Sequence, residues 1–170
     1  MRADFDQRFT TLMKAEGAAL ARLAGSYART AGDREDLFQD IAVAIWQALP
    51  RFRGECSERT FLFRIAHNRG IAHLARRRVL TVEAGEDLEL RDARPDPEQS
   101  LSAEQQGRRL RDAVVALPVV YRQVVTLALE GLSYAEIGAV LGITESNVGA
   151  RLTRARQMLR TRLKGPSYGV

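Results

Sequence analysis

The sequence predicts an all-α protein in which two small helical domains are joined by a flexible acidic linker. Apolar residues recur at spacings of three and four along most of the chain, and no stretch shows convincing strand alternation. The exception is residues 81–103, which contain two prolines and lack a sustained apolar period. We therefore expect domains at residues 1–80 and 104–170, which are small but long enough to form cores.

Electric charge divides the chain in the same way. Residues 1–80 hold 14 basic and 9 acidic side chains, residues 81–103 hold 2 and 7, and residues 104–170 hold 10 and 5. Two basic domains thus flank an acidic linker within a chain of net charge +5. Nearly all of the basic residues are arginine, which suits forked contacts to phosphate and guanine.

Composition also excludes several classes of protein. The longest apolar run, residues 113–121, is interrupted by Pro118 and falls far short of the roughly 20 residues of a membrane helix. The start of the chain lacks the apolar core of a signal peptide. Cys56 is the single cysteine, which excludes an internal disulfide and a multi-cysteine zinc site. We expect no membrane insertion, no metal and no cofactor.

The first domain is predicted to contain three or four packed helices. A broken apolar stripe marks the first helix in residues 5–23. Asp33 is placed to cap the second helix, and Pro50 ends it because proline disfavours helix in the preceding residue. A polar loop, residues 51–57, precedes a third helix that begins near Phe61 and runs into a cluster of three arginines.

The second domain shows the best helical periodicity of the chain. Pro118 separates its first two helices, and a short helix follows over residues 134–141. Gly142 is expected to form a turn, and Thr144 or Glu145 opens the last helix. The apolar residues of that helix are Val148, Leu152, Ala155, Leu159 and Leu163.

Residues 133–156 form a helix-turn-helix pattern. Gly142 supplies a turn residue that tolerates positive φ, and Gly138 lets the two helices approach closely. One face of the last helix is polar and can enter a major groove. It carries Asn147, Ala150, Arg151 and Arg154. The alternative is a three-helix bundle with an ordinary basic face, and the Gly-Ile-Thr turn with Val148 at the right distance favours the helix-turn-helix.

Two segments resemble bacterial extracytoplasmic-function (group IV) sigma factors of the sigma-70 family. DREDLFQDIAVAIWQALPRFRGECSERTFLFRIAHNRGIAHLARRR is similar to their region 2, and ALPVVYRQVVTLALEGLSYAEIGAVLGITESNVGARLTRARQMLRTRL to their region 4. The resemblance implies a cytoplasmic, non-enzymatic protein that binds core RNA polymerase and directs promoter-specific transcription initiation. It also implies that region 4 reads a minus-35 element as duplex and region 2 a minus-10 element as melted strand.

The resemblance assigns DNA-binding positions in both domains. Those facing the minus-35 element are Ser146, Asn147, Ala150, Arg151 and Arg154. Those facing the minus-10 element are Phe52 and Asn68, in a pocket for a flipped base, and Arg64, Arg69, Arg76, Arg77 and Arg78, on backbone phosphates. Gly149 departs from the family, in which many relatives carry a basic residue there, and glycine loosens a helix slightly.

Contact with the polymerase is also implied by the resemblance. The acidic helix of region 2 would dock on the coiled coil of the largest subunit through Asp36, Gln39, Asp40 and Trp46, and the flap of the polymerase is a further implied contact. Acidic residues near this helix start also suit the helix dipole, and both roles can hold. The acidic linker would thread through the polymerase, and an anti-sigma factor is a possible further partner.

Two other readings compete with this one. A stand-alone helix-turn-helix regulator would explain the second domain but neither the acidic helix nor the loop around Cys56. An enzyme or metal protein would use Cys56, His67 and His73, but the two histidines are six residues apart and do not share a helical face. Phe61 and Ile65 are expected to be plain core residues.

Overall fold

The computed structural model describes residues 2–84 and 102–164, with side chains for residues 4–80 and 102–164. Within these ranges the chain is helical and contains no strand, which confirms the predicted all-α class. Most of the predicted linker lies outside the described residues. None of the helices in these ranges is both long and apolar enough to cross a membrane.

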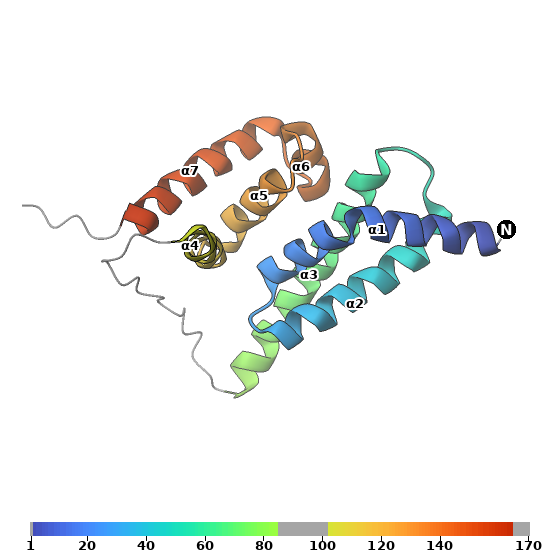
Figure 1. Cartoon of the computed structure of the whole chain (residues 1–170), viewed down its shortest axis with the longest axis horizontal. Helices are drawn as coiled ribbons and strands as arrows, with labels where there is room; N and C mark the ends of the chain where they lie inside the picture. Colours follow the sequence, from blue (N-terminus) through green and yellow to red (C-terminus); the bar gives the residue numbers. More distant parts are fainter. Residues whose placement is uncertain (1, 85–101, 165–170) are drawn as a thin grey trace, which may run out of the picture.

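Three helices form the first lobe, which comprises residues 2–84 (Figure 1). Each of the three packs against the other two around a core that includes Leu23, Ile41 and Phe63. The predicted apolar residues Phe61 and Ile65 flank this core, because the fully buried positions of the third helix are offset by one or two residues. The elements are α1 (Arg2–Tyr27), α2 (Ala31–Ala48), the 3₁₀ turn η1 (Leu49–Arg51) and α3 (Glu58–Ala84).

The boundaries of these helices differ from the prediction at two points. Thr30, not Asp33, caps α2, because the Thr30 hydroxyl accepts a hydrogen bond from the backbone N–H of Asp33. The Asp33 carboxylate instead accepts from the backbone N–H of Arg29 at 2.9 Å. The other difference is the length of α3, which runs to Ala84 and so includes four residues assigned to the linker.

The second lobe comprises residues 102–164 and contains four helices. Leu127, Ile137 and Leu152 lie at the centre of its core, fully or almost fully buried. The predicted stripe of the last helix is buried at its start and becomes exposed at Leu163. The elements are α4 (Ala103–Val115), α5 (Val119–Leu129), α6 (Tyr134–Leu141) and α7 (Glu145–Lys164).

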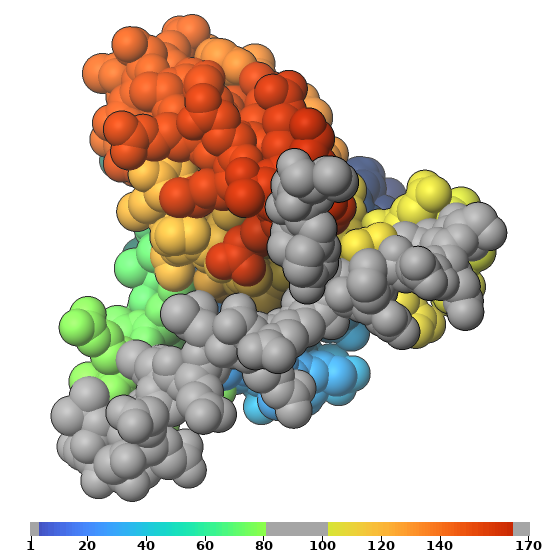
Figure 2. All heavy atoms as spheres, turned by 90° about the vertical axis from the view of Figure 1, so that its left-hand side faces the viewer, coloured from blue at the N-terminus to red at the C-terminus, as the bar shows by residue number. Residues whose placement is uncertain are grey.

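The two lobes pack directly against each other, which the sequence did not predict. Helix α6 lies on α3, and α5 contacts α1. Figure 2 shows the second lobe, in yellow to red, seated on the green and blue first lobe. In the part of the chain that the structure describes, the two domains are therefore in direct contact.

Candidate nucleic-acid interface

Local capping residues set the start and end of the helix-turn-helix. Ser133 and Glu136 form a capping box, in which the Glu136 N–H donates to the Ser133 hydroxyl and the Ser133 N–H donates to the Glu136 carboxylate. Gly142 ends α6 in the left-handed region at φ 70°, as predicted. The Thr144 hydroxyl accepts from the N–H of Asn147, so Thr144 caps α7 and Glu145 is its first residue.

The polar face of α7 points to solvent along its first half. Ser146, Asn147, Ala150 and Arg154 are exposed, and Arg151 is half-buried. Arg151 Nε donates to the Asn147 Oδ1 atom at 3.0 Å, which orients the guanidinium group along the face. The structure thus brings the predicted minus-35 residues together on one open surface of a groove-sized helix.

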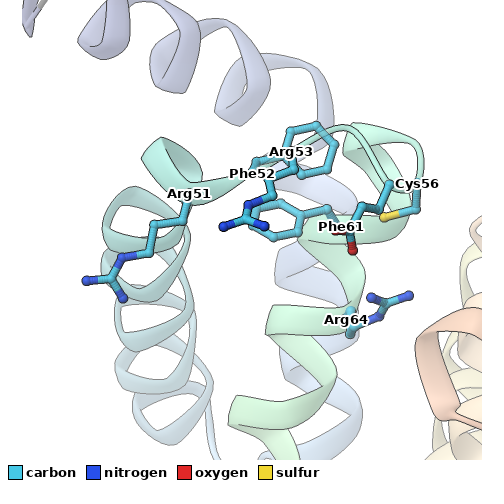
Figure 3. A pocket seen from close by; sticks show the side chains of 7 residues that line it. Arg51, Phe52, Arg53, Cys56, Phe61 and Arg64 are labelled. Atoms are coloured by element: carbon cyan, nitrogen blue, oxygen red, sulfur yellow. The ribbon is translucent and has the colours of Figure 1, made fainter.

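A pocket of about 250 Å³ lies between the polar loop and the start of α3 (Figure 3). The rings of Phe52 and Phe61 are stacked in a tilted arrangement, with centroids 4.6 Å apart. The volume falls below the roughly 300–1,000 Å³ of drug-sized ligand sites. Phe61 therefore belongs to the pocket as well as to the edge of the core. The pocket is lined by Arg51, Phe52, Arg53, Glu55, Cys56, Phe61 and Arg64.

The pocket combines an aromatic surface with an excess of positive charge. Three arginines and one glutamate line it, and rings beside positive charge are the features that single-stranded nucleic acids bind. Arg64, predicted to bind phosphate, is at the rim. Asn68, predicted to line the pocket, is not among its lining residues. It lies exposed one helical turn beyond Arg64, and its role in holding a base stays a prediction.

Arg8 of α1 is a pocket-supporting residue that the sequence did not single out. Its guanidinium carbon lies 5.7 Å from the centroid of the Phe52 ring, within the range of a cation–π contact. Its Nε donates to Glu58 Oε1 at 2.9 Å. Phe52 is thus in contact with both Arg8 and Phe61. No pattern near Arg8 reveals this role, because Glu58 is 50 residues away in the chain.

Replacing Arg8 by alanine is expected to weaken binding of a melted minus-10 strand about twofold to fivefold. This corresponds to the roughly 0.5–1 kcal/mol of an exposed cation–π contact. Arg8→Lys keeps the positive charge and should recover part of the loss. Fluorescence anisotropy with a labelled single strand measures the effect, and Lys14→Ala on the same helix is the control. Equal affinities of the two alanine variants would show that Arg8 does not position Phe52.

Several residues predicted to bind DNA or polymerase pair with one another between α2 and α3. Asp40 lies 3.9 Å from both Arg69 and Arg76. Asp33 pairs with Arg77 and lies 2.9 Å from His73 Nε2. These arginines and the two aspartates therefore form a cluster of ion pairs between α2 and α3. The aspartates partly neutralise the charge of the arginines.

The other predicted residues of the first lobe are open to solvent. Asp36, Gln39 and Arg78 are exposed. Trp46 is 40% exposed, and its ring and that of Phe5 form a T-shaped pair with centroids 5.9 Å apart. Asp36, Gln39 and Trp46 recur at spacings of three and seven, so they form one open row on α2.

The two histidines have structural partners. The Tyr27 hydroxyl lies 2.8 Å from His67 Nδ1, and burial lowers the pKa of His67. His73 faces Asp33. Among the described residues no three histidine, cysteine or acidic side chains are gathered as a metal site would require. The metal-protein reading therefore finds no support in this part of the chain.

A helix-turn-helix lobe and a helical lobe with a basic, aromatic pocket together define a two-lobed nucleic-acid-binding protein. Residues 12–79 match the family model of Sigma-70 region 2, and residues 107–159 match that of Sigma-70, region 4. The chain is 34% identical over 168 residues to the RNA polymerase sigma factor CnrH of Cupriavidus metallidurans, covering 94% of this chain and 88% of CnrH. It is 34% identical over 152 residues to the ECF RNA polymerase sigma factor SigE of Mycolicibacterium smegmatis, covering 88% of this chain and 59% of SigE.

Solved structures agree with these matches. CnrH in complex with the cytosolic domain of CnrY matches 94% of this chain and 89% of that one, with a TM-score of 0.68 and 29% identity. The sigma factor RpoE in complex with the anti-sigma factor NepR, from Bartonella quintana, matches 95% and 97%, with a TM-score of 0.73 and 25% identity. The chain belongs to the sigma-70 family of RNA polymerase sigma factors, in its extracytoplasmic-function group. Proteins of this family act with core RNA polymerase in promoter-specific transcription initiation.

Proposed function

We propose that this sigma factor reads its promoter in two physical states, the minus-35 element as duplex and the minus-10 element as melted strand. The observation that supports the proposal is that one chain carries two surfaces of different shape and chemistry. The α7 face is convex and polar, whereas the pocket of the first lobe is concave, aromatic and basic.

Duplex reading is assigned to α7. A helix fits the major groove, where arginine can donate two hydrogen bonds to the O6 and N7 atoms of guanine. Arg151 and Arg154 are one helical turn apart on the exposed face, and Asn147 holds Arg151 in place. Ser146 and Ala150 complete the same surface. Contacts from other basic side chains of the lobe to phosphate would position the helix without specifying sequence.

Reading of the melted strand is assigned to the pocket around Phe52. A base flipped out of the stack needs an apolar ring to stack on and a cation near its phosphate. Phe52 and Phe61 provide the ring surface, and Arg53 and Arg64 provide charge. The arginines at the lower end of α3, including Arg78, extend the path for the backbone.

Polymerase docking is assigned to the open row on α2. Asp36 and Gln39 are exposed, and Trp46 offers an apolar surface beside them. Acidic side chains on a basic lobe would orient its encounter with the coiled coil of the largest subunit if that surface carries complementary charge. We assign the flap to the second lobe and the bacterial cytoplasm as the site of action. An anti-sigma factor is a further partner, as for RpoE.

Reconstituted transcription tests the proposed function. Purified chain with core polymerase is expected to start transcription at a cognate promoter, which start-site mapping after overexpression would identify. Neither component should do so by itself. A footprint of the isolated chain on promoter duplex, without any polymerase-dependent transcript, would instead identify a stand-alone regulator. Core enzyme that neither binds the chain nor gains promoter-dependent transcripts would contradict the proposal.

A further inference from the structure

Tyr134, the first residue of α6, presents an exposed phenol beside the helix that is assigned to the DNA. Helix α6 packs against α7, and Figure 1 shows it next to the start of that helix. Tyr134 is 42% exposed, although it carries a large aromatic ring. Within the described parts of the chain its hydroxyl group has no hydrogen-bond partner, whereas the hydroxyl of the buried Tyr27 lies 2.8 Å from His67 Nδ1.

Gly149 of α7 provides the surface on which the Tyr134 ring rests. A Cβ atom at Gly149 would lie 3.5 Å from Tyr134 Cε2, an ordinary van der Waals contact. The ring carbon next to Cε2 bears the hydroxyl group, so the hydroxyl also lies at the edge of α7. A side chain longer than alanine at position 149 would compete with the ring for this place.

The position of Gly149 on α7 puts Tyr134 at the border of the polar face. At 3.6 residues per turn, Gly149 is rotated by about 60° from Ser146, which is on that face, and by about 160° from Arg151. The polar face therefore has Arg151 on one side and the ring of Tyr134 on the other. A duplex that receives this face would meet both side chains.

Two hydroxyl groups close to Tyr134 are already engaged within the protein. Thr153 Oγ1 donates to the carbonyl oxygen of Gly149 at 3.0 Å. The Ser133 hydroxyl accepts from the backbone N–H of Glu136 in the capping box. The phenol of Tyr134 is thus a donor on this side of α7 that is left for a ligand.

The chemistry of a phenol at this place fits a phosphate group. In a helix-turn-helix the first helix crosses the DNA backbone while the second enters the groove. Tyrosine is among the side chains that donate to phosphate oxygens and so fix the register of a protein on the duplex. A neutral donor can do this beside Glu145, the acidic first residue of α7, without an ion pair.

We propose that Tyr134 donates a hydrogen bond to a backbone phosphate at the edge of the groove that α7 enters, and that Gly149 allows its ring to take this position. Tyr134 is then a positioning residue, which sets how α7 lies in the groove and reads no base itself. This inference rests on the proposed function, in which α7 reads the minus-35 element as duplex.

Tyr134→Phe tests the contact because it removes the hydroxyl and keeps the ring on Gly149. The probe is a duplex that contains the mapped minus-35 element and ends before the minus-10 element. Holoenzyme made from the full variant chain and core polymerase should bind it about threefold to tenfold more weakly, the scale of one net hydrogen bond. Tyr121→Phe in α5 is the matched control, because the Tyr121 ring packs against the core. Both variants should keep the thermal stability of the parent.

Two further measurements distinguish a phosphate contact from a base contact or a purely structural role. The loss should be the same on a duplex with altered minus-35 bases, because phosphate is common to both. Single methylphosphonate substitutions should include one position that weakens the parent and leaves Tyr134→Phe unchanged. The slope of log affinity against log salt concentration should be equal for parent and variant, since a neutral phenol releases no counterion.

Substitutions at Gly149 test its part in the arrangement. Gly149→Ala should bind as the parent does, because its Cβ atom would only touch the ring. Gly149→Leu should displace the ring and weaken binding, and adding Tyr134→Phe to it should cost less than a further twofold. Additive losses in the double variant would overturn the role of Gly149.

Three outcomes would overturn the phosphate contact. They are equal affinities of the parent and Tyr134→Phe holoenzymes, a loss confined to the cognate duplex, and a loss that is explained by weaker association with core polymerase. Failure of the proposed function would appear separately, as absence of promoter-dependent transcription by the parent chain with core enzyme.

Discussion

Replacing Gly138 by alanine is expected to lower the free energy of unfolding of the second lobe by about 1–3 kcal/mol. A Cβ atom at this position would lie 2.7 Å from the backbone oxygen of Ile143, in the turn between α6 and α7. Alanine is favoured over glycine in a helix by about 1 kcal/mol. This gain is outweighed because the atom in the way belongs to the backbone of Ile143, which cannot move aside as the end of a flexible side chain can. The steric term therefore dominates, and the angle between the two helices must change.

Urea denaturation measures this loss with a probe for each part of the chain. Circular dichroism reports all helices, whereas the fluorescence of Trp46, the single tryptophan, reports the first lobe. The Gly138→Ala transition should move to lower urea by circular dichroism more than by Trp46 fluorescence. Gly107→Ala in α4 is the control, because a Cβ there meets nothing closer than 3.8 Å. Equal stability of the two variants would contradict close helix contact at Gly138.

Arg151→Ala is expected to weaken binding to the minus-35 duplex about 10- to 100-fold, with core polymerase binding unchanged. The range is about 1.4–2.7 kcal/mol, which lies within the roughly 1–3 kcal/mol of a forked arginine–guanine contact. Asn147 holds the guanidinium group in the free protein, so little ordering is left to be done on binding. Electrophoretic mobility shift or anisotropy assays at fixed salt concentration give the two affinities.

Arg156→Ala is the matched control for this variant. Arg156 is exposed on the same helix but turned away from Arg151 by about 140°, from five residues at 3.6 per turn. A base-reading role predicts that Arg151→Ala loses affinity for the cognate site and little for unrelated duplex. Equal losses on both duplexes would reassign Arg151 to phosphate binding, and a parallel loss of polymerase binding would indicate misfolding.

The second lobe could be predicted from the sequence nearly residue by residue. The bounds of α6, the left-handed turn at Gly142 and the start of α7 all depend on capping and turn residues a few positions away. The first lobe was less predictable at its boundaries. Thr30 and Asp33 both suit a helix start, and only the geometry of the backbone shows which of them is the cap.

For the first lobe, the sequence predicted the kind of site but not all of the residues that line the pocket. The loop around Phe52 was expected to hold a base, and a pocket lies there. Asn68 is outside that pocket, and Phe61, expected in the core, lines it. A helix rotates 100° per residue, so a small error in the direction of the α3 core face moves a side chain between pocket, core and solvent.

The sequence by itself determined the helices, the turn, the polar face of α7 and the family. These features depend on periodicity, caps and motifs, which act over a few residues. Only the tertiary structure decided that Arg8 contacts Phe52, that Asp40 lies between Arg69 and Arg76, and that Glu130 joins the lobes. Arg22 and Glu130 are 108 residues apart. No local pattern specifies which of many arginines a carboxylate will meet, because that depends on how the packed helices place them.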